Sequence, residues 1–264
     1  MPYQWRRNKY ARKVFEAMSE ESVFPVLAQS GNPGLVVSLT SFPLRISTLH
    51  LVIKSILKQD TLPERICLCL SEQEFPGRDV DLPNELTDLV PYGLEIAFVS
   101  YNLRPHNKYY YAFDKYPDKT IVTMDDDYIY GPDTISRLVR IHEKFSQAVC
   151  TNRTRRVLVC GDGFATYGKW SIVKSDDIIK DKSLIALGFG GVLYPPGSHD
   201  ADFLDVTLSQ RLAPRADDLW LKALELKKGI DVATGGGRFP QPVVIPRSQK
   251  EALNKGNHVA GDGK

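Results

Sequence analysis

Short apolar runs alternate with helix-spaced apolar residues through the first half of the chain, and this alternation limits the fold more than any other feature. Four runs have the length of buried strands, at residues 35–39, 65–70, 94–100 and 120–124. Between them, residues 49–57 repeat at helical spacing, and residues 107–116 have the pattern of a short helix. Strands that alternate with helices build a parallel sheet with its functional groups at the carboxyl edge. The sequence therefore predicts an α/β fold.

Three consecutive carboxylates, Asp125, Asp126 and Asp127, follow the last of these runs. Like charges crowded at a strand end are unfavourable unless they are neutralised, and a divalent cation would neutralise them. Carboxylate oxygens suit Mg²⁺ or Mn²⁺, and Mg²⁺ usually shares its coordination sphere with the phosphates of a substrate. The structural alternative is an Asp-rich turn, with Asp133 as the cap of a helix at residues 134–145.

Five motifs in a fixed order resemble a GT-A glycosyltransferase. Residues 38–45 (SLTSFPLR), Asn107-Lys108 and the aspartate triplet, a DXD-type motif, resemble its nucleotide-sugar half. Residues 188–196 (GFGGVLYPP) and 216–220 (ADDLW) resemble the acceptor half of bacterial capsule and lipopolysaccharide glycosyltransferases, and more distantly the exostosin-like group. Each motif alone is weak, and their order carries the resemblance.

The resemblance implies a GT-A type fold, a Rossmann-like and mainly parallel sheet flanked by helices, with a smaller acceptor-side half. We expect an N-terminal helical segment at residues 1–30 and one glycosyltransferase domain at residues 31–264. Within that domain we expect the nucleotide-sugar half at residues 31–133 and the acceptor half at residues 134–264.

The resemblance also assigns roles on the donor side. Asp125 would contact the donor ribose and the metal, Asp127 would bind the metal, and Asp126 would support them at the nucleotide site. His258 is a candidate for an additional metal ligand, although a lone histidine in a glycine-rich tail also fits a solvated loop.

The remaining donor-side candidates are cations, a hydroxyl group and glycines. Arg45 and Lys108 would lie near the nucleotide with Thr40, and surface charge at a helix start is their structural alternative. The glycines at residues 188–191, Gly190 and Gly191 above all, would let the backbone approach the donor sugar, although a tight turn also requires glycine.

On the acceptor side, Asp217 and Asp218 precede an apolar helix at residues 219–226. The resemblance places a general base at the end of this acidic pair, so Asp218 is the first candidate and Asp217 the second. Helix capping is the structural alternative for either carboxylate. Trp220 fits an acceptor stacking face or the core.

These roles together imply a metal-dependent glycosyltransferase. It would move a sugar from a nucleoside-diphosphate sugar, foremost a UDP-sugar, to a hydroxyl of a growing glycan or lipid-linked acceptor in surface polysaccharide synthesis. Stereochemistry stays open, because the exostosin-like enzymes retain configuration and many capsule enzymes invert it.

Two alternative functions remain. A sugar nucleotidyltransferase would need a glycine-rich phosphate loop, which residues 36–45 lack, and the other alternative is an inactive carbohydrate-binding scaffold.

The composition is that of an ordinary globular domain. The net charge of +2 does not indicate a nucleic-acid partner. No apolar run long enough for a membrane span or signal peptide is present, so a cytoplasmic enzyme is expected, either alone or as a module of a larger polysaccharide-synthesis assembly. The four cysteines lack zinc or disulfide spacing and are expected to be buried and reduced.

The N-terminal segment mixes basic and aromatic residues, and two interpretations of it stay open. Its basic residues could contact anionic headgroups at the inner face of a membrane while Trp5, Tyr10 and Phe15 lie at the interface. Alternatively, the segment forms a helix that packs on the domain or mediates self-association. Glu16, Glu20 and Glu21 favour the second interpretation, because they offset the basic charge.

Overall fold

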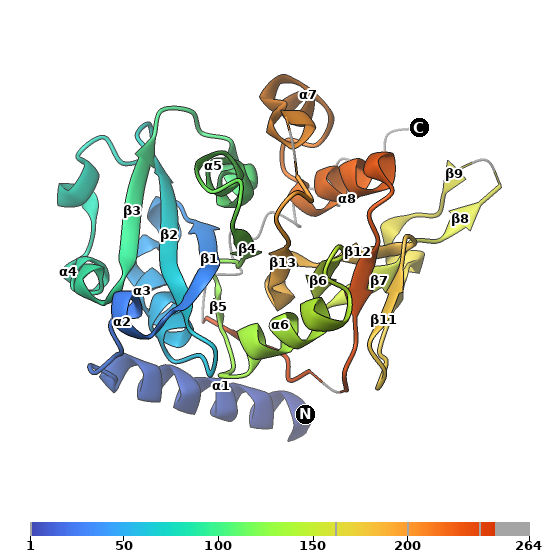
Figure 1. Cartoon of the computed structure of the whole chain (residues 1–264). Coiled ribbons are helices and arrows are strands. Elements are labelled where there is room, and N and C mark those ends of the chain that lie inside the picture. The colour runs from blue at the N-terminus through green and yellow to red at the C-terminus, as the bar shows by residue number, and fades with distance from the viewer. Residues whose placement is uncertain (1, 162, 200, 238, 246–264) are drawn as a thin grey trace.

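The structure is a computed structural model that describes residues 2–161, 163–199, 201–237 and 239–245. An eight-stranded sheet in the order β11-β14-β6-β13-β4-β1-β2-β3 forms its centre (Figure 1). These strands are β1 (Asn32–Thr40), β2 (Pro63–Ser71), β3 (Leu94–Val99), β4 (Thr120–Thr123), β6 (Val149–Thr151), β11 (Ile179–Asp181), β13 (Val192–Tyr194) and β14 (Val232–Thr234). The four strands predicted from apolar runs, β1 to β4, are parallel neighbours, which confirms the predicted α/β fold.

The second half of the chain breaks the parallel pattern. Strand β13 is antiparallel to both of its neighbours, β4 and β6, and β11 is antiparallel to β14. Antiparallel insertion makes β13 start where β4 ends, with Val192 opposite Thr123. The segment that precedes β13 therefore lies beside the residues that follow β4.

Helices cover both faces of the sheet. The α-helices are α1 (Pro2–Glu20), α2 (Leu27–Ser30), α3 (Pro43–Leu57), α4 (Asn84–Thr87), α5 (Asn107–Lys115), α6 (Thr134–Lys144), α7 (Val206–Leu212) and α8 (Asp217–Lys228). Side chains of a strand alternate between its faces. Accordingly, Val37 and Leu39 of β1 share a core with α3 and α6, whereas Val36 shares one with α5 and α8.

Short elements complete the second half of the chain and the edges. The 3₁₀ helices are η1 (Arg78–Asp81), η2 (Val90–Tyr92), η3 (Arg104–His106), η4 (Tyr167–Lys169), η5 (Gly188–Gly190) and η6 (Ala201–Leu204). The remaining strands are β5 (Tyr128–Ile129), β7 (Thr154–Arg156), β8 (Val159–Cys160), β9 (Gly163–Phe164), β10 (Ser171–Ile172), β12 (Leu184–Ala186) and β15 (Val243–Val244). They form the sheet β10-β7-β12 and the pairs β15-β5 and β8-β9.

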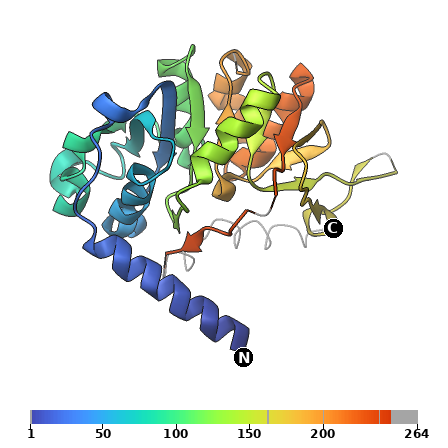
Figure 2. The same ribbon diagram turned by 60° about the horizontal axis from the view of Figure 1, so that its bottom comes forward.

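The N-terminal helix α1 lies along the outside of the domain below α3 (Figure 2). Val14, Phe15 and Met18 pack against the core that contains α3. Phe15 is therefore partly buried against the domain, and contact of this helix with a membrane stays a prediction. The side chains of residues 2–9, which include Trp5, Arg6, Arg7 and Lys9, lie outside the described part. In that part, no helix has both the length and the apolar character that crossing a membrane requires.

Three of the four cysteines confirm the expected burial. Cys67 and Cys69 point to the same side of β2, with their Sγ atoms 3.8 Å apart, and Cys150 lies in β6. Cys160 is exposed, so the prediction of a buried thiol is wrong there. The reason is its position in the hairpin β8-β9, which projects from the domain (Figure 1).

Candidate functional site

The aspartate triplet begins two residues after the end of β4, at the carboxyl edge of the sheet. Ser38 of β1 pairs with Thr123 of β4, so the two parallel strands end side by side. The turn after β1 therefore faces the triplet, and the Ser41 hydroxyl donates to Asp126 Oδ2 over 2.6 Å. The α/β pattern thus brings together residues that are 85 positions apart.

Arg45, in the first turn of α3, neutralises part of the triplet. Its guanidinium lies 2.5 Å from Asp126 Oδ1 and 3.2 Å from Asp127 Oδ2, and all three side chains are about nine-tenths buried. Burial and the neighbouring charge of Asp125 nevertheless raise the pKa of Asp127 to about 7, against the opposing effect of Arg45. One arginine does not fully compensate the buried carboxylates.

Lys108 connects the two halves of the chain. It stands in the first turn of α5, and its ammonium lies 2.8 Å from Asp125 Oδ1 and 2.7 Å from Asp217 Oδ2. Burial acts to lower the pKa of Lys108, but Asp125 and Asp217 together raise it well above the usual value. The lysine is therefore charged and holds a carboxylate of the triplet next to one at the start of α8.

Asp218 completes the cluster from the start of α8. Its Oδ2 accepts a hydrogen bond from the backbone N–H of Gly188 over 3.3 Å. A Cβ on Gly188 would lie 2.9 Å from the Lys108 ammonium and 3.1 Å from Asp125 Oδ1, so the close approach needs glycine. Burial, followed by the charge of Asp217, raises the pKa of Asp218 to about 8.

Helix capping does not account for this acidic pair. The cap residue of α8 is Ala216, and neither aspartate makes a capping side-chain hydrogen bond. The analogous alternative for the triplet also lacks support, because Asp133 precedes α6 without a side-chain capping bond. Asp217 and Asp218 therefore point into the cluster instead of satisfying the helix end.

The cluster carries excess negative charge that suits a divalent cation. Five carboxylates face two basic groups; the acids are Asp125, Asp126, Asp127, Asp217 and Asp218, and the bases are Arg45 and Lys108. Among the described residues, no group of three or more His, Cys, Asp and Glu side chains is arranged to hold a metal by itself. Mg²⁺ commonly takes one or two carboxylates together with substrate phosphates, so the hard oxygens of Asp125 and Asp127 fit such an ion.

Other predicted site residues lie away from this cluster or outside the described residues. Thr40 donates to the backbone oxygen of Cys69 over 2.6 Å. Gly190 packs against Arg153, and Gly191 faces Leu138 and Thr134 of α6. Trp220 is 4% exposed in the core, which supports the packing interpretation. His258 lies outside the described residues.

The structure adds two residues that the sequence prediction did not assign. Ser41 anchors Asp126, and the Tyr130 hydroxyl accepts from the backbone N–H of Asp125 over 2.8 Å. Gly188, which was predicted with the other glycines at 188–191 to approach the donor sugar, contacts Asp218. Ser41 had a detectable signal, since it is the first polar residue after a strand that ends at the carboxyl edge. Tyr130 had none, because its role depends on a turn that the pattern does not specify.

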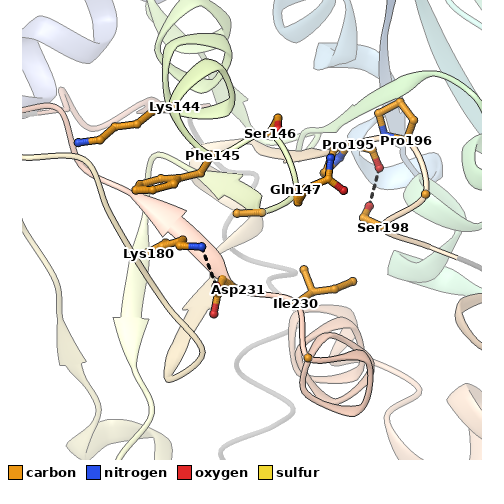
Figure 3. Close-up of a pocket in the computed structure, with 13 residues that line it drawn as sticks. Lys144, Phe145, Ser146, Gln147, Lys180, Pro195, Pro196, Ser198, Ile230 and Asp231 are labelled. Carbon is orange, nitrogen blue, oxygen red and sulfur yellow. Dashed lines mark hydrogen bonds and ion pairs between the residues drawn. The ribbon is translucent and has the colours of Figure 1, made fainter.

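A cavity of about 440 Å³ lies at the opposite edge of the sheet (Figure 3). Residues at the ends of α6 and α8 and before β6 and β14 line this cavity. Among them are Phe145, Lys180, Pro195 and Ile230. Lys180 pairs with Asp231 at 3.3 Å. None of the clustered carboxylates reaches this cavity, so the two sites are separate.

Comparisons with known proteins show similarity of fold. No protein-family model matches the sequence, and no curated protein matches it. The 4-diphosphocytidyl-2C-methyl-D-erythritol synthase of Anaerococcus prevotii matches with a TM-score of 0.51 and 10% identity, over 86% of this chain and 97% of that one. A second structure of such a synthase matches with a TM-score of 0.50 and 9% identity, over 83% and 96%. S. aureus TarS 1–349 in complex with UDP matches with a TM-score of 0.44 and 10% identity, over 76% and 57%.

Proposed function

We propose that this chain is a metal-dependent glycosyltransferase that uses a nucleoside-diphosphate sugar, foremost a UDP-sugar. The observation that supports this proposal best is the double ion pair of Lys108 with Asp125 and Asp217. It joins the donor-side triplet to the acceptor-side acidic pair, and a transfer reaction needs groups for both substrates within one site.

On the donor side, Asp125 and Asp127 would hold Mn²⁺ or Mg²⁺. Such an ion, when bound, stabilises the negative charge of a diphosphate leaving group. Asp126 has both oxygens engaged, by Ser41 and by Arg45, and so acts as a support that orients the arginine. Arg45 would also lie within reach of the donor phosphates. Thr40, Gly190 and Gly191 would contribute less directly, through the backbone around the site.

On the acceptor side, Asp218 would accept the proton of the attacking hydroxyl. A general base works best when its pKa lies near the working pH. The raised pKa of Asp218, about 8, supports that role in a way that an ordinary surface carboxylate would not. Asp217, which pairs with Lys108, would hold the lysine in place.

We propose a glycan or lipid-linked acceptor and a role in capsule or lipopolysaccharide synthesis at the cytoplasmic face of a membrane. The residues that support this assignment are the motifs at 188–196 and 216–220. Peripheral attachment through α1 and participation in a larger assembly belong to the same proposal.

A sugar nucleotidyltransferase is the second candidate, favoured by the two fold matches with TM-scores of 0.50 and 0.51, both to proteins named as diphosphocytidyl-methylerythritol synthases. The turn after β1 argues against it, because residues 36–45 contain no glycine that would let backbone N–H groups surround a triphosphate. An inactive carbohydrate-binding scaffold is a third candidate.

One set of assays separates the three candidates. The full chain is incubated with UDP-, GDP- and CMP-sugars, with Mn²⁺, Mg²⁺ or chelator, and release of free nucleotide is measured. In parallel, nucleoside triphosphates with sugar phosphates are assayed for pyrophosphate release. We expect metal-dependent release of nucleoside diphosphate. Pyrophosphate release would establish the second candidate, and inactivity in every mixture would favour the scaffold.

A matched pair of variants links the assay to the site. Lys108→Ala should abolish the activity, because it separates Asp125 from Asp217. Lys115→Ala should not, because that lysine lies in the same helix but is exposed. Equal activity in both variants would contradict the proposed site.

A further inference from the structure

The hairpin β8-β9 projects from the domain (Figure 1), and it carries exposed apolar side chains. Val159 and Phe164 are directly opposite each other in the ladder, so their side chains share a face, and they are 63% and 69% exposed. An isolated two-stranded hairpin is marginally stable in water. Contiguous exposed apolar side chains commonly mark a binding surface.

The hairpin extends the neighbouring pair of strands, β7 and β10. The chain passes from β7 through β8 and β9 to η4 and β10, and the backbone bond from Ala165 N to Leu158 O joins the two arms. Ile172 of β10 is opposite Arg155 of β7 and is 57% exposed. We call the exposed apolar residues of this segment, Ile172 on β10 and Val159 and Phe164 on the hairpin, the apolar strip.

Tyr167 stands at the inner end of this strip, and its ring is held in place although it is 42% exposed. The Arg155 guanidinium lies 4.8 Å from the centre of the Tyr167 ring, and the Trp170 ring lies 5.4 Å from it. Arg155 also donates to the backbone oxygen of Trp170 over 2.8 Å. An exposed aromatic ring with a fixed orientation can bind a ligand at little cost in conformational entropy.

The strip leads to the proposed general base. Strand β7 pairs with β12, and Gly188, two residues beyond β12, donates to Asp218. Arg155 of β7 is opposite Ile185 of β12, three residues before Gly188. The Tyr167 ring, which contacts Arg155, is therefore connected to Asp218 through β7 and β12.

We propose that Tyr167, Arg155, Ile172, Val159 and Phe164 form the site for the lipid phosphate part of a lipid-linked acceptor, with its apolar chain along the hairpin and its accepting hydroxyl towards Asp218. This inference rests on the proposed glycosyltransferase function. The charge of the strip supports an anionic head, because Arg155 and the exposed Lys169 form no ion pair within the described residues. A lipid phosphate combines that charge with an apolar chain.

The test uses dodecyl phosphate below its micelle concentration and butyl phosphate as probes, with binding to the full chain measured by calorimetry. Dodecyl phosphate should bind at least tenfold more tightly than butyl phosphate, because its longer chain removes more apolar surface from water. Phe164→Ser and Tyr167→Ala should each weaken the binding of dodecyl phosphate about tenfold. Val80→Ser is the control, since Val80 is 90% exposed on η1, away from the strip, and it should bind like the unmodified chain.

Three results would overturn the inference. They are equal affinity for both probes, equal loss of affinity in the Val80 variant, and a dimer that dissociates in Phe164→Ser, which would show that a second copy covers the strip.

Nucleotide-sugar hydrolysis by the unmodified chain separates this inference from the proposed function. Hydrolysis without lipid binding contradicts the acceptor site alone, and lipid binding without nucleotide release contradicts the transferase alone.

Discussion

At the residue scale, the site depends on carboxylates that are buried with too little positive charge. Asp127 shows the consequence, because its pKa in the folded chain is about 7 while the ordinary value is 3.8. A carboxyl group whose pKa is higher in the folded state stabilises the fold at pH values below its unfolded-state pKa. This stabilisation is lost as the pH rises through its folded-state pKa. Ionised Asp127 therefore destabilises the metal-free protein at pH 8.

The first prediction concerns Asp127→Asn. In chelator at pH 8 this variant should melt at or above the temperature of the unmodified chain, and in metal it should lose activity. Asp125→Ala should reduce activity strongly. Asp114→Asn, at an exposed position on α5, is the control and should change neither property. Thermal melts and nucleotide release measure the two effects. Full activity of the unmodified chain in chelator would refute the metal requirement.

The second prediction separates binding from chemistry at Asp218. Asp218→Asn should bind the donor normally and transfer sugar roughly 10²-fold more slowly, the scale expected for removal of a positioned base. Donor affinity is measured by titration and transfer by single-turnover kinetics. If Asp217→Asn is the inactive variant instead, the two aspartates have the reverse of the roles assigned here.

Some residues of the candidate site could be predicted from the sequence, and others could not. Arg45, Lys108 and Asp218 could be found because each follows a recognisable strand or begins a helix, and those positions face the carboxyl edge in any α/β sheet. Tyr167 could not be selected, because its position depends on β7, β10 and β12. Strands of two or three residues are too short to show a period.

At the element scale, the same limit explains which parts of the fold were predictable. The buried strands β1 and β2 each span nine residues and stand out as apolar runs. The antiparallel β13 has three residues, and its direction depends on the long connection before it, which has no periodic pattern. The parallel half was therefore predictable, and the mixed half was not.

Helix α8 contains a buried ion pair that the site does not use. Lys222 and Glu225 are 4% and 1% exposed, and their charged groups lie 3.3 Å apart. Burial raises the pKa of Glu225 to about 7 although Lys222 opposes the shift. The ionised form of Glu225 is therefore unfavourable in the folded chain. The free energy of unfolding decreases as the pH rises from about 4.5 to about 7.

The third prediction follows from this pair. Glu225→Gln should remove that part of the pH dependence, so that its stability relative to the unmodified chain increases between pH 5 and pH 8. Urea denaturation at several pH values measures the difference. Glu143→Gln, an exposed position on α6, should run parallel to the unmodified chain at every pH. Parallel curves for Glu225→Gln as well would show that Glu225 stays ionised throughout.

At the scale of the whole molecule, the N-terminal helix is joined to the domain by apolar contacts and by α3. Lys54 of α3 donates to the backbone oxygens of Ser19 and Glu21 over 3.2 and 2.7 Å, and Lys58 pairs with Glu21. Arg12 pairs with Glu16 on the exposed side, which reduces the free positive charge of the helix. These contacts dock α1 on the domain.

The last prediction tests that docking through one ring. Phe15→Ala should lower the free energy of unfolding by roughly 1–2 kcal/mol, because a partly buried aromatic side chain loses its contact with the core. Tyr10→Ala, five residues earlier and 64% exposed, should cost less than about 0.5 kcal/mol. Urea denaturation of both variants gives the comparison. Equal, small effects would mean that α1 leaves the domain in solution, and its aromatic residues would then be available for the membrane contact considered from the sequence.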